Sequence, residues 1–102
     1  MGILNLLFGK KTNKQALKQL LKEGAIIVDV RTKGEYSSGY INGSENFPLQ
    51  DISSKKDQIL AMKKVIFCCA SGLRSAQATN YFKSKGLVCL NGGSWKTVNE
   101  LV

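Results

Sequence analysis

The residues best suited to chemistry lie in segment 68–75, which reads Cys-Cys-Ala-Ser-Gly-Leu-Arg-Ser. The apolar run Val65–Cys68 before the loop is typical of a buried strand, and the residues after Ser75 have the pattern of a helix. Cys69 would then lie where a strand gives way to a helix N-terminus. Unpaired backbone N–H groups and a partial positive charge at such a place favour a thiolate. The sequence therefore predicts Cys69 as a nucleophile.

Two further residues of this loop indicate how a thiolate would be stabilised. Gly72 allows the backbone to curl so that successive N–H groups surround one point, and Arg74 adds a permanent cation. The chain contains no histidine, which excludes Cys-His and Ser-His-Asp catalysis and His-ligated metal sites. We expect backbone amides and a guanidinium to stabilise the Cys69 thiolate in place of a histidine. For Cys68 we favour the simpler interpretation of a small buried residue at a strand end.

Length and composition indicate one globular domain. The chain has 102 residues, 43% of them hydrophobic and 22% charged. We assign residues 12–102 to the domain and residues 1–11 to an apolar and basic N-terminal segment, which lacks the features of a signal peptide and is too short to span a bilayer. We expect that segment to pack on the domain as a helix, with contact to a membrane or a partner as the alternative.

The net charge and the cysteine content limit which binding partners and which cellular compartment are expected. The formal net charge is +8, from 15 Lys and Arg against 7 Asp and Glu, and the lysines are scattered through polar stretches. This favours a solvated surface that also suits a small anionic substrate, and no aromatic-studded basic stripe points to nucleic acid. Three cysteines, an odd number with two adjacent, favour a reducing compartment, so we expect a cytoplasmic protein.

The elements expected to position the loop alternate between helix and strand. Thr12 and Gln15 form a capping-box pattern, and Gly24 ends the helix that follows them. The further expected elements are a strand at 25–30, a helix at 33–38, a turn at 42–43, an extended stretch at 47–49, a helix from 53 or 54 to 62, strands at 65–68 and 87–90 with a helix between them ended by Gly86, a turn at 91–93, and a last helix capped by Ser94 with Trp95, Val98 and Val102 inward. This alternation predicts an α/β domain with a central parallel sheet and helices on both faces.

The motifs from about Gly24 to Trp95 resemble the rhodanese-like domain family in kind and in order. They are Asp29-Val-Arg31, Glu35-Tyr36, Gly39-Tyr40-Ile41 with Gly43, the loop Cys69–Ser75, and Gly92-Gly93 with Trp95. Two departures concern local packing and donor preference. Many members have histidine at the position of Tyr40, and the spacing from Gly93 to Trp95 is shorter than usual.

The resemblance implies a three-layer fold and a sulfurtransferase reaction that needs no cofactor and no metal. In it, Cys69 takes sulfane sulfur from thiosulfate or another persulfide donor and passes it, as a persulfide, to cyanide or to a small or protein thiol. The substrate-binding residues implied, mainly through their backbone N–H groups, are Ala70, Ser71, Gly72, Leu73, Arg74 and Ser75. Arg74 would also support an anionic donor.

Three charged residues outside the loop form a separate group. We expect Asp29, Arg31 and Glu35 to make a charged network that braces the active loop, in preference to contacting substrate directly. Trp95 is expected in the core or in a pocket wall.

Three alternatives stay open at this point. Cys68 and Arg74 have the Cys-x5-Arg spacing of phosphatases, some of which share the rhodanese fold. The fold can also serve as a non-catalytic binding module. Finally, Cys68 could resolve a persulfide on Cys69 into a disulfide, although neighbouring strand residues face opposite sides of a sheet.

Overall fold

The described residues are built on a four-stranded parallel sheet in the order β2-β1-β3-β4. A computed structural model describes residues 11–102, so the expectations for the N-terminal segment lie outside the described residues, apart from Lys11. The strands are β1 (Ile26–Asp29), β2 (Glu45–Asn46), β3 (Lys64–Cys69) and β4 (Val88–Ser94). Asp29 pairs with Cys68, so β1 and β3 end side by side at one edge. The predicted parallel sheet is confirmed.

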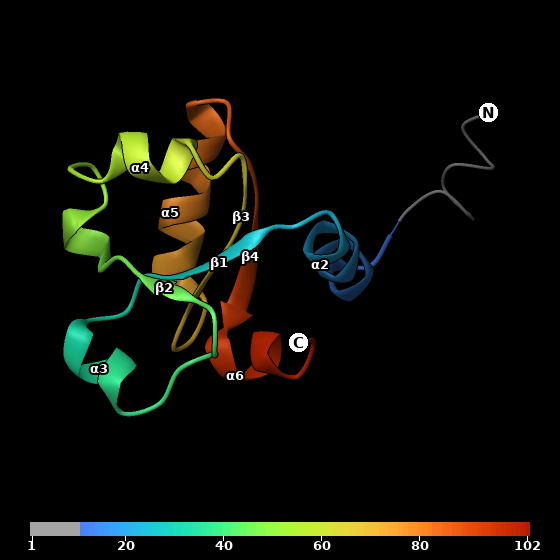
Figure 1. Cartoon of the computed structure of the whole chain (residues 1–102), viewed down its shortest axis with the longest axis horizontal. Coiled ribbons are helices and arrows are strands. Elements are labelled where there is room, and N and C mark those ends of the chain that lie inside the picture. The colour runs from blue at the N-terminus through green and yellow to red at the C-terminus, as the bar shows by residue number, and fades with distance from the viewer. Residues whose placement is uncertain (1–10) are drawn as a thin grey trace.

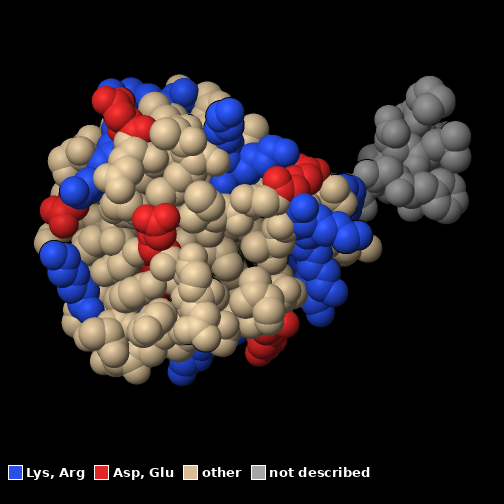
Figure 2. Space-filling model, in the orientation of Figure 1, with Lys and Arg blue, Asp and Glu red and all other residues tan. Residues whose placement is uncertain are grey.

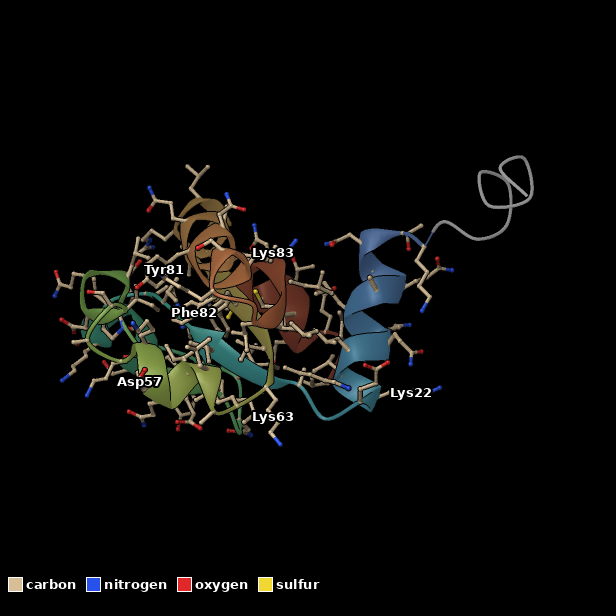
Figure 3. The ribbon with its side chains drawn as sticks, turned by 90° about the horizontal axis from the view of Figure 1, so that it is seen from above. Lys22, Asp57, Lys63, Tyr81, Phe82 and Lys83 are labelled. Carbon is tan, nitrogen blue, oxygen red and sulfur yellow. The ribbon has the colours of Figure 1, made fainter. Side chains whose placement is uncertain are left out.

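Helices cover both faces of this sheet, as predicted. They are α2 (Asn13–Lys22), α3 (Lys33–Ser37), α4 (Lys56–Leu60), α5 (Leu73–Ser84), α6 (Trp95–Asn99) and the short 3-10 helix η2 (Leu49–Asp51). In Figure 1, α4 and α5 lie on one side of the strands and α2 on the other. Figure 3, seen from above, separates α2 with Lys22 from α5 with Tyr81, Phe82 and Lys83 in the same way.

Two apolar clusters hold these layers together, one on each face of the sheet. On the α5 face, the ring of Phe82 stacks on that of Phe67 with centroids 5.4 Å apart. On the other face, Leu17 of α2 and Val98 of α6 pack with Ile66 of β3. Because side chains alternate along a strand, consecutive residues of β3 belong to different clusters.

The start of α2 follows the sequence prediction closely. The Thr12 side chain accepts a hydrogen bond from the Gln15 N–H, and the Gln15 side chain accepts one from the Thr12 N–H, which completes the capping box. A second capping box, between Thr32 and Glu35, starts α3. It fixes the orientation of Glu35.

Element boundaries differ from the prediction in several places. The edge strand is β2 at Glu45–Asn46, and the predicted extended stretch at 47–49 follows it, with the Phe47 and Leu49 N–H groups donating to the carbonyls of Asp29 and Val30. Helix α4 is shorter than predicted and begins at Lys56 without a side-chain cap. The last helix ends at Asn99, so Val102 is 64% exposed and does not point inward.

The segment 91–93, predicted as a turn, belongs to β4 and contains a β-bulge. Asn91 pairs with Phe67 and Gly93 with Cys68, which leaves Gly92 as the extra residue. A Cβ on Gly92 would lie 2.5 Å from a methyl carbon of Val98, so only glycine fits there. Beyond the bulge, Ser94 pairs with Cys69, so the end of β4 lies beside the start of the loop after β3.

The described part of the chain carries a charged surface without a basic stripe in the view shown. Figure 2 shows Lys and Arg side chains around the rim of this face and over α2, with acidic side chains among them.

Within residues 11–102, no helix has the length and apolar character needed to cross a bilayer.

Candidate active site

Cys69 ends β3 and points into the turn that leads to α5. The N-cap of α5 is Gly72, whose φ of +102° is a left-handed conformation that favours glycine. The Gly72 N–H donates to the Cys69 Sγ at 3.0 Å and the Ser75 N–H donates to it at 3.4 Å. The Ser75 Oγ lies 3.3 Å from the same sulfur. These groups form a cradle of dipoles around one sulfur atom.

The cradle changes the acidity of Cys69. Burial raises the pKa of this thiol, since the residue is 0% exposed, but hydrogen bonds from the Ser75 side chain and from the backbone of Ser75, Gly72 and Ser71 lower it. The hydrogen bonds outweigh burial, so the pKa of Cys69 lies below its ordinary value. The loop thus shifts the ionisation of Cys69 toward the thiolate without histidine, in the direction that the sequence predicts.

Cys68 has the opposite environment. Its side chain is fully buried in the cluster under α2 and α6, on the other face of the sheet from Cys69. Burial, and then the negative charge of Asp29, raise its pKa. The geometry therefore does not support Cys68 as a phosphatase nucleophile. It does not support a bridge between the two neighbours either.

Arg74 forms an ion pair with Glu35 across the mouth of the loop. Its Nη1 and Nη2 donate to Oε1 and Oε2 of Glu35 at 2.7 and 3.0 Å. The side chains remain about one third exposed, at 34% and 38%. The Arg74 guanidinium, and next the backbone N–H of Thr32, lower the pKa of Glu35 to about 2. The predicted cation beside Cys69 therefore already has a carboxylate partner.

Asp29 and Arg31 form a separate, buried ion pair. The Arg31 Nε and Nη2 donate to the Asp29 carboxylate at 2.8 to 3.0 Å, and both residues are at most 4% exposed. The Arg31 guanidinium lies 4.6 Å from the Trp95 ring centroid. It also donates to the Glu35 carbonyl at 3.2 Å. The expected single network is thus two ion pairs, joined by one backbone contact.

Two hollows flank the Arg74 and Glu35 pair. One of about 280 Å³ is largely apolar and is lined by Val30, Thr32, Pro48, Leu49, Gln50 and Arg74. The other, of about 500 Å³, is lined by Arg31, Glu35, Ser38, Gly39, Trp95 and Lys96. The ion pair divides the surface beside the loop, and Trp95 forms a wall, as predicted.

The remaining predicted loop residues have different positions. Ala70 and Ser71 are exposed, and the Leu73 side chain is 78% exposed. No hydrogen bond joins the amides of Ala70, Leu73 or Arg74 to the Cys69 sulfur within the described structure. The hydrogen bonds to the Cys69 sulfur therefore come from part of the predicted ring, and the role of the other amides toward a substrate stays a prediction.

Asn91 is part of the site and is absent from the sequence prediction. Its Oδ1 accepts hydrogen bonds from the Ser75 hydroxyl at 2.7 Å and from the Gly93 N–H at 2.9 Å. Its Nδ2 donates to the Gly72 carbonyl at 3.2 Å. The only sequence signal at this position is Asn-Gly-Gly, which reads as a turn. Asn91 is beside the loop because β4 pairs with β3, and that pairing is not visible in the local sequence.

The low pKa of Glu35 predicts an acid-dependent loss of stability. A carboxylate whose pKa falls on folding stabilises the protein above its unfolded pKa, here 4.5, and this contribution is lost as the pH falls toward about 2. We expect Glu35→Gln to flatten the decrease in free energy of unfolding between these pH values, measured by urea denaturation. Exposed Glu100→Gln is the matched control and should keep the wild-type slope. An unchanged slope in Glu35→Gln would contradict the prediction.

Comparison with known proteins places the chain in a family. The profile of the rhodanese-like domain matches residues 13–100, and the chain belongs to this family. A sulfurtransferase of Allochromatium vinosum is 31% identical over 86 residues, which cover 79% of this chain and 80% of that protein. The uncharacterized protein YqhL of Bacillus subtilis is 32% identical over 62 residues, covering 61% of this chain and only 49% of YqhL.

Solved structures agree on the fold. A rhodanese-like domain protein from Staphylococcus aureus superposes with a TM-score of 0.70 at 26% identity, covering 85% of this chain and 86% of that one. A protein of unknown function from Rhodopseudomonas palustris, described as a possible tyrosine phosphatase, superposes with a TM-score of 0.67 at 28% identity, covering 86% and 76%. Proteins with this fold are thus described with more than one activity. The residues of the site, and not the fold, have to distinguish between a sulfurtransferase and a phosphatase.

Binding of a metal ion by protein side chains needs a cluster of ligating groups. Among residues 11–102, no group of three or more His, Cys, Asp or Glu side chains gathers as a possible metal site.

Proposed function

We propose that the protein is a sulfurtransferase that carries sulfane sulfur as a persulfide on Cys69. One observation carries the proposal: the hydrogen bonds of the loop converge on the Cys69 sulfur, while Cys68 faces the opposite core. The name of the Allochromatium vinosum relative supports the same class of reaction. The substrates proposed are a small anionic sulfur donor, such as thiosulfate, and a thiol or cyanide acceptor.

The chemistry divides into two displacements at sulfur. The Cys69 thiolate attacks the sulfane sulfur of thiosulfate, the sulfur–sulfur bond of the donor breaks, and sulfite leaves with its electron pair. An acceptor thiolate then attacks the outer sulfur of the persulfide. The bond to Sγ breaks, and Cys69 returns to the thiolate while the acceptor leaves as a persulfide. The N–H donors of Gly72 and Ser75 are placed to stabilise negative charge in this cycle.

The burial of Cys69 limits which sulfur donors can reach its side chain. The residue is 0% exposed, and the exposed loop residues Ala70 and Ser71 follow it directly. Reactive cysteines need access to solvent as well as a low pKa. We therefore expect the donor to be small, or the loop to move aside when it binds.

Intact mass spectrometry tests the proposal. After incubation with thiosulfate, wild-type protein should gain the mass of one sulfur atom and lose it again when cyanide or a thiol is added. Cys69→Ala should gain nothing, and the matched variant Cys68→Ala should behave as the wild type. No gain on wild-type protein would contradict the proposal and favour a non-catalytic binding module.

A further inference from the structure

Asn91 links β4 to the cradle in one fixed orientation. The Gly93 N–H, 2.9 Å from Oδ1, can only donate, and the Gly72 carbonyl, 3.2 Å from Nδ2, can only accept. Turning the amide over would place donor against donor and acceptor against acceptor. The Oδ1 of Asn91 therefore faces Ser75.

This orientation decides where the hydroxyl proton of Ser75 lies. Ser75 has one proton to donate, and the 2.7 Å hydrogen bond to the Asn91 Oδ1 uses it. The Ser75 Oγ, 3.3 Å from the Cys69 Sγ, then presents a lone pair to the sulfur. It can accept the proton of a neutral thiol. It can donate to a thiolate, which is the contact that lowers the pKa of Cys69, only by turning away from Asn91.

We propose that Asn91 is a positioning residue that holds the Ser75 proton while the Cys69 sulfur is neutral and yields it when that sulfur becomes negative. This inference rests on the proposed function and extends it. Successive contacts of 2.7 and 3.3 Å link Asn91 on β4 to Ser75 on α5 and Ser75 to Cys69 on β3, and Ser75 is 0% exposed, so no solvent competes for its proton. In this proposal Asn91 affects the ionisation of Cys69 through Ser75.

The arrangement fits the second displacement. In the persulfide the inner sulfur, Sγ, is neutral and the outer sulfur carries the charge, so Ser75 rests on Asn91. When the acceptor takes the outer sulfur, the electron pair of the broken bond stays on Sγ. The Ser75 hydroxyl turns and donates to the developing thiolate, and no proton is gained or lost. The hydrogen bond is then stronger in the transition state than in the persulfide.

Among the described residues, the charged and titratable groups around Cys69 come from four elements, since Glu35 on α3 is paired with Arg74. Arg74 on α5 and Cys68 on β3 interact electrostatically with it, and Asp29 and Arg31 on β1 are paired with each other. The Asn91 and Ser75 substitutions that follow leave Arg74, Asp29 and Arg31 in place. A change in Cys69 titration then reports on the hydroxyl and the amide.

The test is a double-mutant cycle on Asn91 and Ser75, made in a Cys68→Ala background so that one loop thiol reacts. The pH dependence of iodoacetamide alkylation gives a midpoint, which reports ionisation, and a plateau, which reports access. Asn91→Ala frees the Ser75 proton for the sulfur, so the midpoint should fall by about one pH unit. With Ser75→Ala also present, Asn91→Ala should leave the midpoint unchanged.

Two outcomes would overturn the inference: an equal shift in both backgrounds, which assigns the effect to the Gly72 contact, or a midpoint that stays or rises in Asn91→Ala. If Asn91→Ala does not fold by circular dichroism, Asn91→Asp replaces it. That variant keeps the acceptor and holds the proton more tightly, so it should raise the midpoint more with Ser75 present than without it, and equal rises would refute the role. Alkylation needs no sulfur transfer, so this result is independent of the persulfide mass.

Discussion

Replacing Cys69 with alanine is expected to reduce thiosulfate-to-cyanide sulfur transfer by about a thousandfold or more, to the level of the uncatalysed reaction. The thiolate is the only group in the cradle that can form the sulfur–sulfur bond, and the donors of Gly72 and Ser75 have no second sulfur to act on. Steady-state rates with thiosulfate and cyanide, measured on folded protein, provide the check.

The matched control for this prediction is the neighbouring cysteine. Cys68→Ala removes the same atoms one residue earlier, in the cluster on the opposite face of the sheet. We expect its rate to stay within about twofold of the wild type, with a loss of stability from the vacated volume. The reverse pattern, loss in Cys68→Ala and retention in Cys69→Ala, would contradict the assigned nucleophile and revive the Cys-x5-Arg phosphatase.

Among the substitutions considered, removing the Arg31 side chain is expected to lower the free energy of unfolding most. Arg31→Leu leaves the carboxylate of Asp29, which is 0% exposed, without its partner, and it also removes donors to the carbonyls of Glu35 and Gly39. Breaking a buried ion pair in this way costs about 3 to 5 kcal/mol in the free energy of unfolding. Urea denaturation monitored by circular dichroism gives the value.

A surface variant and a double variant frame this experiment. Lys33→Leu changes an exposed cation two residues away and should alter the free energy of unfolding by about 0.5 kcal/mol or less. Adding Asp29→Leu to Arg31→Leu removes the stranded charge and should recover part of the loss. A cost below about 1 kcal/mol for Arg31→Leu alone would mean that the pair does not anchor β1 to α3.

Local sequence patterns predicted the features that depend on neighbouring residues. The capping box at Thr12, the apolar runs that became β1 and β3, and the thiol at a strand-to-helix junction each require only a few consecutive residues to be recognised. The cradle around Cys69 follows from the same local geometry, because Gly72 and Ser75 are close to it in the chain.

The features that the sequence did not reveal depend on pairing between distant segments. Glu35 and Arg74 are 39 residues apart, and nothing in either segment shows that the carboxylate meets this guanidinium and not Arg31. Asn91 lies beside Ser75 because β4 pairs with β3, which sets Asn91 opposite Phe67 in the regular register ahead of the bulge. Asn-Gly-Gly is a turn pattern in isolation, and the tertiary ladder overrides it.

The placement of the three cysteines has a consequence for how long a captured sulfur stays. All three lie in the described part of the chain; Cys68 is beneath the sheet, and Cys89 pairs with Val65, four positions before Cys69, or about 13 Å along the strand. Under the proposed chemistry, no thiol of the same molecule can unload the persulfide. A molecule that carries the Cys69 persulfide would therefore keep the sulfur until an acceptor molecule arrived. Under this chemistry the protein would store sulfane sulfur as well as transfer it.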